Sequence, residues 1–241
     1  MEEPKESLAS LSKSEGFQVL KIFESRKNTV VLIKIQGANR VLKLYASGQV
    51  ENLGKEYHIL EEGHDIGLNV PEPYYRVERA IIMEYIEGEN LMDAINDTSV
   101  PMSQKKAQIG LLVGWLSSFH KAFRKGNQFL LRGDANLRNF ILTWEIWGLD
   151  FEEAEMGRPE QDLGNLCCSI LASDPMFVPW KVELCNLLVE SYSSRVEWSV
   201  EDIPSYIAGI LEEKANLRPR DAELLREKAA IIAEKGLDAI M

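Results

Sequence analysis

Three polar residues, Asp134, Asn139 and Asp150, are spaced so that they can carry out metal-dependent chemistry. Asn139 directly precedes the apolar stretch Phe140-Ile141-Leu142, and Asp150 follows a second short apolar stretch, so we expect a hairpin with both residues at one end. Their side-chain oxygens are hard ligands of the kind that Mg²⁺ prefers, together with water and nucleotide phosphate. Asp134, in the loop before the hairpin, can then orient a hydroxyl group and accept its proton.

Each of these residues also has an ordinary structural explanation. Asp and Asn are common turn residues, so Asp134 and Asn139 can simply form a turn. Asp150 can be a polar cap at the end of a strand. A turn, however, does not require a second Asp after an apolar strand, and this favours the magnesium site.

Length and charge restrict the class of protein. A chain of 241 residues can bury a full hydrophobic core, as one large or two small lobes, without disulfides or metal. The formal charge of -11 argues against nucleic-acid binding, which depends on Lys and Arg neutralising phosphates. The first residues are polar and no apolar run approaches the roughly 20 residues of a membrane helix, so we expect a cytoplasmic protein without a membrane span.

The N-terminal part has the pattern of a small antiparallel sheet crossed by one helix. Short β-branched runs are separated by turn-like residues, including Gly37-Ala38-Asn39. Helical spacing of apolar residues predicts a helix over 50–62 that ends at Gly63. The predicted strands are 17–23, 29–35, 41–45, 74–77 and 80–85.

The remainder of the chain has mainly helical patterns. A long helix whose cap is Ser103 is followed by a strand-loop-strand stretch over 129–151, and a Ser199-x-x-Asp202 capping pattern opens a later helix. The predicted C-terminal helices are 162–171, 179–193, 199–215 and 220–235, the last closed by Gly236. Composition changes once, near Gly88. We therefore expect a polar leader over 1–14 and two lobes, over 15–87 and 88–241.

The order of these motifs resembles the protein-kinase-like superfamily. Asp134-x-x-x-x-Asn139 and Leu149-Asp150-Phe151 look like its catalytic loop and metal-binding Asp. Gly133-Asp134 and the segment 156–164 are similar to the aminoglycoside phosphotransferase and choline kinase branch, in which the Asp at position 162 is structural. His120, at the end of the preceding apolar helix, is expected to be a core histidine that bonds the catalytic loop.

The N-terminal half resembles the same superfamily independently. By that resemblance Lys43, in the third strand, binds the α- and β-phosphates of ATP, and Glu56, in the following helix, fixes Lys43 by an ion pair. The segment 81–88 resembles the hinge where backbone groups contact adenine, and this makes Met83, Glu84 and Ile86 candidate nucleotide-binding residues.

Three positions depart from the pattern of the superfamily. The turn 24–29 contains no glycine, so Ser25, Lys27, Asn28 and Thr29 would contact phosphates only through side chains. Arg132 stands where this branch usually has His, and Asn136 stands where it commonly has His. Arg132 or Arg138 can supply positive charge to the transferring phosphoryl group.

The resemblance implies an α+β, bilobal, protein-kinase-like phosphotransferase. Its small antiparallel-sheet N-lobe, over 15–87, would bind nucleotide, and its mainly helical C-lobe, over 88–241, would hold the catalytic loop and the acceptor pocket. It implies that ATP and Mg²⁺ bind between the lobes, with Asp134 as the catalytic carboxylate and Asn139 and Asp150 on magnesium. The expected acceptor is the hydroxyl group of a small molecule. Five acidic side chains near the expected site are interpreted first as solvated surface, and the alternative is an acidic rim that attracts a cationic acceptor such as an amine or an aminoglycoside. Those side chains are Glu87, Glu89, Glu152, Glu153 and Glu155.

Three other functions stay open from the sequence alone. The same fold serves lipopolysaccharide-type sugar kinases and small atypical protein kinases, and fold by itself does not name the acceptor. A pseudokinase that binds nucleotide without turnover is consistent with the glycine-free turn. The presence of Lys43, Asp134, Asn139 and Asp150 together argues against it.

Overall fold

The structure, a computed structural model, describes residues 8, 11, 12, 15–25 and 27–241. Most of the predicted leader over 1–14 lies outside these residues. The chain forms two compact units: Met1–Glu87 with Leu149–Glu152, and Gly88–Gly148 with Glu153–Met241. The four residues Leu149–Glu152 thus pack with the N-terminal unit although they follow in sequence a large part of the second. No helix in the described ranges is long and apolar enough to cross a bilayer.

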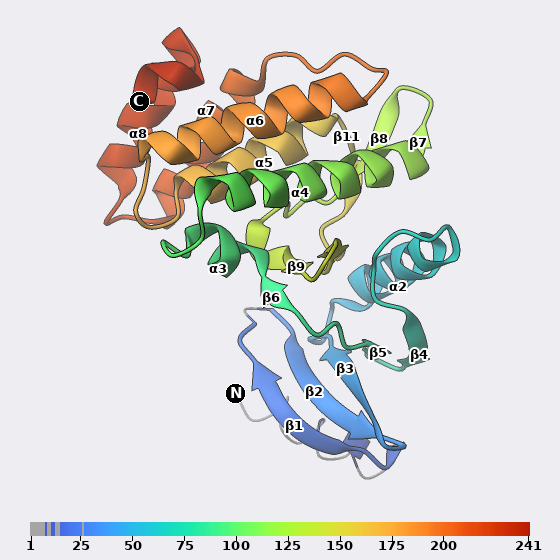
Figure 1. Cartoon of the computed structure of the whole chain (residues 1–241). Helices are drawn as coiled ribbons and strands as arrows, with labels where there is room; N and C mark the ends of the chain where they lie inside the picture. Colours follow the sequence, from blue (N-terminus) through green and yellow to red (C-terminus); the bar gives the residue numbers. More distant parts are fainter. Residues whose placement is uncertain (1–7, 9–10, 13–14, 26) are drawn as a thin grey trace. The chain divides into compact units, whose positions relative to one another are not determined.

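The first unit is built on a five-stranded sheet with the strand order β1-β2-β3-β5-β4 (Figure 1). All neighbouring strands are antiparallel. The strands are β1 (Gln18–Phe23), β2 (Thr29–Ile35), β3 (Ala38–Leu44), β4 (Pro73–Val77) and β5 (Ala80–Glu84). Each of the five predicted strands is present, because β-branched runs with alternating burial are well suited to a sheet with one covered face.

The turn between β2 and β3 is tighter than the sequence prediction. Only Gln36 and Gly37 connect the strands, with φ angles of 51° and 84°, and the strand resumes at Ala38. Positive φ at both central residues is typical of the two-residue turns that match the twist of antiparallel strands. Ala38 and Asn39 belong to β3 and pair with Ile35 and Lys34. The predicted turn Gly37-Ala38-Asn39 is therefore wrong at these two residues.

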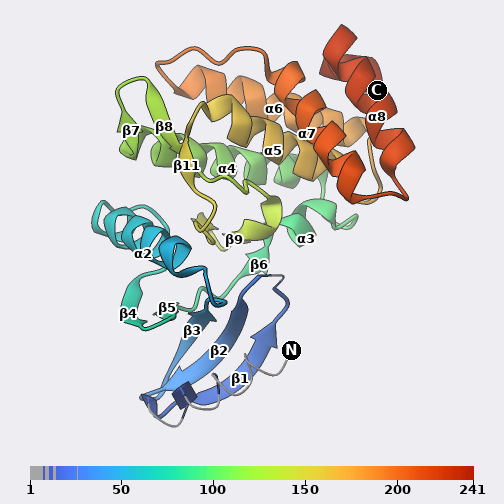
Figure 2. The same cartoon turned by 180° about the vertical axis from the view of Figure 1, so that it is seen from behind.

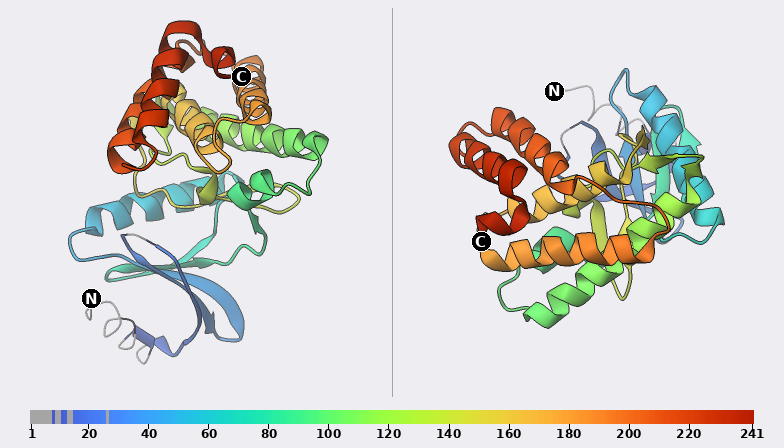
Figure 3. Two further views of the ribbon diagram at one scale, coloured as in Figure 1. Left: turned by 90° about the vertical axis from the view of Figure 1, so that its left-hand side faces the viewer. Right: turned by 90° about the horizontal axis from the view of Figure 1, so that it is seen from above.

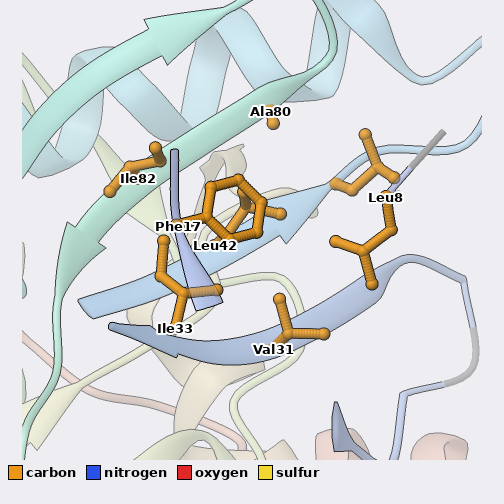
Figure 4. Packing of buried hydrophobic residues seen from close by; sticks show 8 residues of the cluster. Leu8, Phe17, Val31, Ile33, Leu42, Ala80 and Ile82 are labelled. Atoms are coloured by element: carbon orange, nitrogen blue, oxygen red, sulfur yellow. The ribbon is translucent and has the colours of Figure 1, made fainter. Parts of the chain in front are cut away.

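One face of this sheet carries the hydrophobic core of the first unit (Figure 4). Val31 and Ile33 lie two residues apart on β2, so the alternation of a strand puts both side chains on the same face. Phe17 and Leu42 join them there. Lys43, one residue after Leu42, consequently points to the opposite face of the sheet.

Helix α2 (Val50–Asp65) follows β3 and packs on β4 and β5. It runs past Gly63, so the predicted end at that residue is wrong. Gly63 is instead needed for close packing, because a Cβ atom there would lie 3.1 Å from a methyl carbon of Val70. The helix ends before Gly67, which has a φ of 76°.

The second unit is mainly helical, and its helices pack in the pairs α4 with α6, α5 with α6, α5 with α7, and α7 with α8 (Figures 2 and 3). Its helices are α3 (Leu91–Asn96), α4 (Met102–Ala122), α5 (Pro159–Leu171), α6 (Pro179–Arg195), α7 (Ile203–Leu217) and α8 (Ala222–Lys235), with the 3₁₀ helices η1 (Leu137–Asn139) and η2 (Leu237–Ile240). The predicted α+β class, with an antiparallel sheet in the N-terminal part and a mainly helical C-terminal part, is confirmed.

The sequence predicted the presence of these helices more accurately than the residues at which they begin. The residue that caps α4 is Pro101, not Ser103, and α7 begins at Ile203 after Asp202, whose side chain accepts from Ser205 instead of capping the backbone. Helix α5 starts at Pro159, three residues before the predicted start, because proline fits the first helical position, which needs no N–H donor.

Short strands of the second unit frame the predicted catalytic loop. The strands are β6 (Glu89–Asn90), β7 (Arg124–Lys125), β8 (Gln128–Leu131), β9 (Phe140–Leu142), β10 (Ile146–Gly148) and β11 (Glu155–Gly157). Strand β9 pairs with both β10 and β6, and β8 pairs with β7 and β11. The hairpin expected after Asn139 is therefore formed, with Phe140 opposite Gly148.

Lys181 is buried at the start of α6, where its ammonium donates to the carbonyl and hydroxyl oxygens of Ser173 at 2.7 and 2.6 Å. Burial lowers the pKa of Lys181 to about 8, since the charged form loses its hydration. The folded chain therefore loses this proton at a lower pH than the unfolded chain does.

We predict that Lys181 makes the free energy of unfolding rise between about pH 8 and about pH 10.4, because the unfolded chain binds more protons in that window. In Lys181→Met this contribution should be absent, so the stability of the variant should rise less over the same window. Urea unfolding measured by circular dichroism across the pH range tests it, with exposed Lys235→Met as control. Parallel pH profiles for wild type and Lys181→Met would contradict the assignment.

Candidate functional site

The ammonium group of Lys43 is surrounded by three carboxylates of the first unit. Its Nζ lies 2.6 Å from Oε2 of Glu56, 2.7 Å from Oδ1 of Asp150 and 3.2 Å from Oε2 of Glu152. Lys43 comes from β3, Glu56 from α2, and the other two from the segment Leu149–Glu152. The four groups together carry a formal charge of −2, so they can accept further positive charge.

Local structure explains why Lys43 and Glu56 meet. Strand alternation directs Lys43 away from the core of the sheet, and Glu56 is a fully buried residue of α2. Tyr45, two residues after Lys43 on the same side of the chain, donates its hydroxyl hydrogen to Glu56. The predicted ion pair between Lys43 and Glu56 is present in the structure.

Burial and neighbouring charges act in opposite directions on the pKa values of this pair. Burial lowers the pKa of Lys43, but the carboxylates of Glu56, Asp150 and Glu152 outweigh burial, and the pKa lies above its ordinary value. Burial raises the pKa of Glu56, and the positive charge of Lys43 opposes the rise only in part. Lys43 therefore stays protonated over the whole physiological range.

Asp150 differs from the other two carboxylates because it is accessible. Its side chain is 40% exposed, whereas that of Glu56 is 1% exposed. Asp150 also has a φ of 63°, which is unusual for a residue other than glycine and is typical of functional positions, where the surrounding structure holds strain. An exposed carboxylate beside a fixed ammonium group can bind a divalent cation without breaking the Lys43–Glu56 pair.

Glu152 was not recognised from the sequence, which suggested a solvated surface residue. The structure buries its side chain against Lys43 and against Asn28, whose amide donates to Glu152. The same Asn28 accepts a hydrogen bond from the backbone N–H of Ala46 at 3.2 Å. The only feature of the sequence that could have indicated this contact is the position of Glu152, two residues after Asp150.

In the second unit, Asp134 and Asn139 lie on one loop and contact each other. The amide Nδ2 of Asn139 donates to the backbone oxygen of Asp134 at 3.0 Å and to its Oδ2 at 3.2 Å. This orientation uses the nitrogen of the Asn139 amide and leaves its Oδ1 available as a ligand. Asp134 is exposed, as a residue must be if it is to contact a substrate.

Gly133 allows the loop to pass close to a neighbouring strand segment. Its φ is 73°, and a Cβ atom there would lie 2.0 Å from the carbonyl oxygen of Glu153. No other residue fits this position without moving the backbone. Asn165 of α5 donates to the carbonyl oxygen of Gly133 at 3.3 Å and holds the loop on its other side.

Buried polar residues anchor the start of the loop. Oδ2 of Asp162 accepts from the backbone N–H of Arg132 at 2.8 Å and lies 3.1 Å from Nε2 of His120. The other ring nitrogen of His120 lies 2.6 Å from the hydroxyl of Tyr192. His120 and Asp162 therefore have the expected structural roles, with the difference that His120 reaches the loop through Asp162.

The two arginines near Asp134 lie in different environments. The guanidinium of Arg132 is buried, 5.3 Å from the ring centre of Trp115 and 4.7 Å from that of Phe140. Contacts of this kind with aromatic faces stabilise a desolvated cation. Arg138 is exposed, so of the two it is the one accessible to a bound molecule.

The predicted hinge residues lie at the end of the sheet. Met83 and Glu84 belong to β5, where Met83 is buried and the backbone N–H of Glu84 donates to the carbonyl oxygen of Glu72 at 2.9 Å. Ile86 is half-buried in the segment after β5. Contact of these three residues with a nucleotide stays a prediction.

The predicted site residues thus form two groups with suitable chemistry. Lys43, Glu56 and Asp150 meet in the first unit, and Asp134 and Asn139 meet in the second. The accessible Asp150 carboxylate and the available Asn139 oxygen are hard ligands that fit Mg²⁺, and Lys43 fits a phosphate group.

Neither a family model nor a curated protein matches this sequence. Solved structures match it at 14 to 16% sequence identity. An aminoglycoside-3'-phosphotransferase of type VIII has a TM-score of 0.64 with 16% identity, over 85% of this chain and 96% of that chain. Choline kinase LicA from Streptococcus pneumoniae has a TM-score of 0.61 with 16% identity, over 98% of this chain and 99% of that one. The streptomycin-ATP-APH(2'')-IIa ternary complex has a TM-score of 0.64 with 14% identity, over 98% of each chain.

The fold is therefore the protein-kinase-like fold, in the form that aminoglycoside phosphotransferases and choline kinases have. The resemblance that the sequence motifs indicate is confirmed at the level of the fold.

We predict that Lys43→Met lowers the free energy of unfolding by about 3 to 5 kcal/mol, because it leaves buried carboxylates without their cation. The pKa of Glu56 is already raised by burial, so the loss should shrink as the pH falls through that raised pKa and Glu56 becomes neutral. Urea unfolding at about pH 5 and about pH 8 measures the difference.

A double variant provides the control for this prediction. In Lys43→Met combined with Glu56→Leu, the buried charge is removed together with its partner, so the loss should be smaller than for Lys43→Met alone. Equal losses in the two variants, with no pH dependence, would show that the ion pair does not stabilise the first unit.

Proposed function

We propose that this protein is an ATP-dependent phosphotransferase that transfers the γ-phosphate of ATP to a hydroxyl group of a small molecule. The observation that carries the proposal is the Lys43 ammonium held at 2.6 Å by buried Glu56 and at 2.7 Å by accessible Asp150. In the protein-kinase-like fold, a lysine fixed in this way binds the α- and β-phosphates, and the neighbouring Asp binds magnesium.

Residues of both units take part in the proposed reaction. Lys43 contacts the phosphates, Glu56 positions Lys43, and Asp150 and Asn139 each provide an oxygen ligand for Mg²⁺. Bound magnesium would neutralise the charge of the phosphate oxygens. Backbone groups at Met83, Glu84 and Ile86 would contact adenine. The streptomycin-ATP-APH(2'')-IIa ternary complex, which has the same fold, contains ATP and supports the choice of nucleotide.

Asp134 is the proposed catalytic carboxylate. Its Oδ2 accepts from Asn139 at 3.2 Å, which orients the carboxylate toward an incoming hydroxyl group. The acceptor oxygen forms a bond to the γ-phosphorus while the bond from that phosphorus to the β,γ-bridging oxygen breaks. The hydroxyl proton goes to Asp134 and ADP leaves.

A small acceptor is favoured over a protein because the segment after Glu152 is short. The six residues Glu153–Arg158 include β11, which pairs with β8, and α5 starts at Pro159. This segment is too short and too firmly paired to form a platform for a peptide. The similar solved structures include a choline kinase and an aminoglycoside phosphotransferase, named for small acceptors.

We predict that Asp150→Ala abolishes the tightening of ATP binding by Mg²⁺, because the variant lacks a ligand of the metal. The fold should survive, since the Asp150 side chain is 40% exposed. Calorimetric titration of ATP with Mg²⁺ and with a chelator measures the effect, and exposed Asp65→Ala at the end of α2 is the matched control. A variant with unchanged metal dependence would exclude Asp150 as a ligand.

We predict that Asp134→Asn keeps ATP affinity nearly unchanged and lowers turnover by roughly 10² to 10⁴, the usual contribution of a positioned general base. Hydrolysis of ATP by water is the assay until the acceptor is known, with Asp65→Asn as control.

Three outcomes would change the proposed function. Equal turnover in wild type and Asp134→Asn would mean that the measured activity does not use this site. A wild type that binds ATP reproducibly without turnover would favour the pseudokinase. Transfer to folded proteins, lost in Asp134→Asn and with no small-molecule product, would favour the atypical protein kinase.

A further inference from the structure

The second unit, in which we expect the acceptor pocket, contains a cavity of about 320 Å³. Its walls come from α3, η1, α5 and α7 and from the chain that follows α5. Nine of its twelve lining residues are polar or charged. A volume of this size is at the lower end of the range of small-molecule sites.

The cavity is adjacent to the loop that carries Asp134. Asn136 and Arg138 of that loop line the cavity. The backbone N–H of Asn136 donates to the carbonyl oxygen of Asp134 at 2.9 Å, and its Oδ1 accepts from Ser169 Oγ at 3.1 Å. The cavity wall therefore includes residues two and four positions after Asp134, on the same loop and in the same unit.

The charges in the cavity wall differ from those of the protein as a whole. The lining includes the cations Arg138, Lys214 and Arg218 and the carboxylates Asp93 and Asp174, which gives a local charge of +1 in a chain whose net charge is -11. Within the described residues, none of these five side chains forms an ion pair with another of the five. The cations are therefore not neutralised by the wall itself.

The three cations are available to a ligand to different degrees. In the part of the chain that the structure describes, the side chains of Arg138 and Lys214 make no hydrogen bond or ion pair. Nη1 of Arg218 donates to the carbonyl oxygen of Ala172 at 2.9 Å. This bond fixes the guanidinium group and leaves its other N–H donors available to a ligand. Lys214 lies in the last turn of α7, and Arg218 is the residue that follows the helix, so both cations come from the C-terminal end of α7.

We propose that this cavity is the acceptor site and that it selects a small polyhydroxy compound with an anionic group, either a carboxylate or a phosphate. The anionic group binds Arg138, Lys214 and Arg218 through charge-assisted hydrogen bonds. Asp93 and Asp174 accept hydrogen bonds from hydroxyl groups of the compound. Another hydroxyl group reaches Asp134, gives up its proton there, and forms the new bond to phosphorus while ADP leaves. This inference rests on the proposed function for its chemical step.

An amine-bearing acceptor fits the cavity less well. It would face three cations, and like charges placed together cost affinity. The acidic residues that suggested an amine do not line the cavity, and one of them, Glu152, is buried beside Lys43 in the first unit.

Three sugars that share one skeleton test the proposal: glucose 6-phosphate, glucose and glucosamine, with gluconate as a second anion. Calorimetric titration of the nucleotide-free protein should show binding of the anionic compounds and weaker or no binding of the other two. Lys214→Gln removes the positive charge and keeps a polar side chain that can donate hydrogen bonds, so it should weaken anion binding by at least about tenfold. Lys235→Gln, on exposed α8 and outside the cavity, should bind as wild type does.

The same compounds, with ATP and Mg²⁺, separate this inference from the proposed function. Anion binding that depends on Lys214, with no phosphate transfer to any acceptor, would support the cavity as an anion-binding site and would contradict the proposed phosphotransferase activity. Transfer only to neutral or amine-bearing compounds would retain the phosphotransferase and overturn the inference. Absence of binding by either anion, or anion binding that is equal in wild type and Lys214→Gln, would also overturn the inference.

Discussion

A single buried ammonium group joins three separate parts of the first unit. Lys43 on β3 contacts Glu56 on α2 and both Asp150 and Glu152 on the segment that follows β10. Each buried carboxylate would be costly without this cation, and the cation would be costly without the carboxylates. The positions of the helix, the strand and the Asp150 segment are therefore coupled through one group. The accessible oxygen atoms of Asp150 are the part of this network that a ligand can reach.

In the second unit, a buried carboxylate connects separate parts of the chain in a similar way. Asp162 accepts hydrogen bonds from the backbone N–H of Arg132 and from the imidazole ring of His120. The other ring nitrogen of His120 contacts the hydroxyl of Tyr192. These groups are buried and contact one another through Oδ2 of Asp162, whereas Asp134, two residues after Arg132, is exposed. A rigid buried anchor next to an exposed carboxylate keeps the exposed group in place without covering it, as a catalytic residue requires.

The glycine-free turn between β1 and β2 is held by side chains. Asn28 is buried, accepts from Ala46 and donates to Glu152, so the turn is tied to the sheet and to the Asp150 segment at once. A glycine-rich loop brings the backbone itself close to phosphates because it has no Cβ atoms. Here the side chain of Asn28 fixes the turn instead, through its hydrogen bonds with Ala46 and Glu152.

The sequence by itself predicted the five strands and the helix of the first unit, the longer helices of the second, and the candidate residues of the two site groups. Alternation along β2 and β3 fixed which side chains meet in the core, and hence that Lys43 lies on the other face. The spacing from Asp134 to Asn139 and Asp150 identified the loop and the hairpin, because those signals are local. Only the tertiary structure decided the burial of Glu152, the aromatic surroundings of Arg132, and the cavity with Arg138, Lys214 and Arg218. Each of these depends on residues far apart in the chain, and a charged side chain has the same local pattern whether it is solvated, buried with a partner or directed into a cavity.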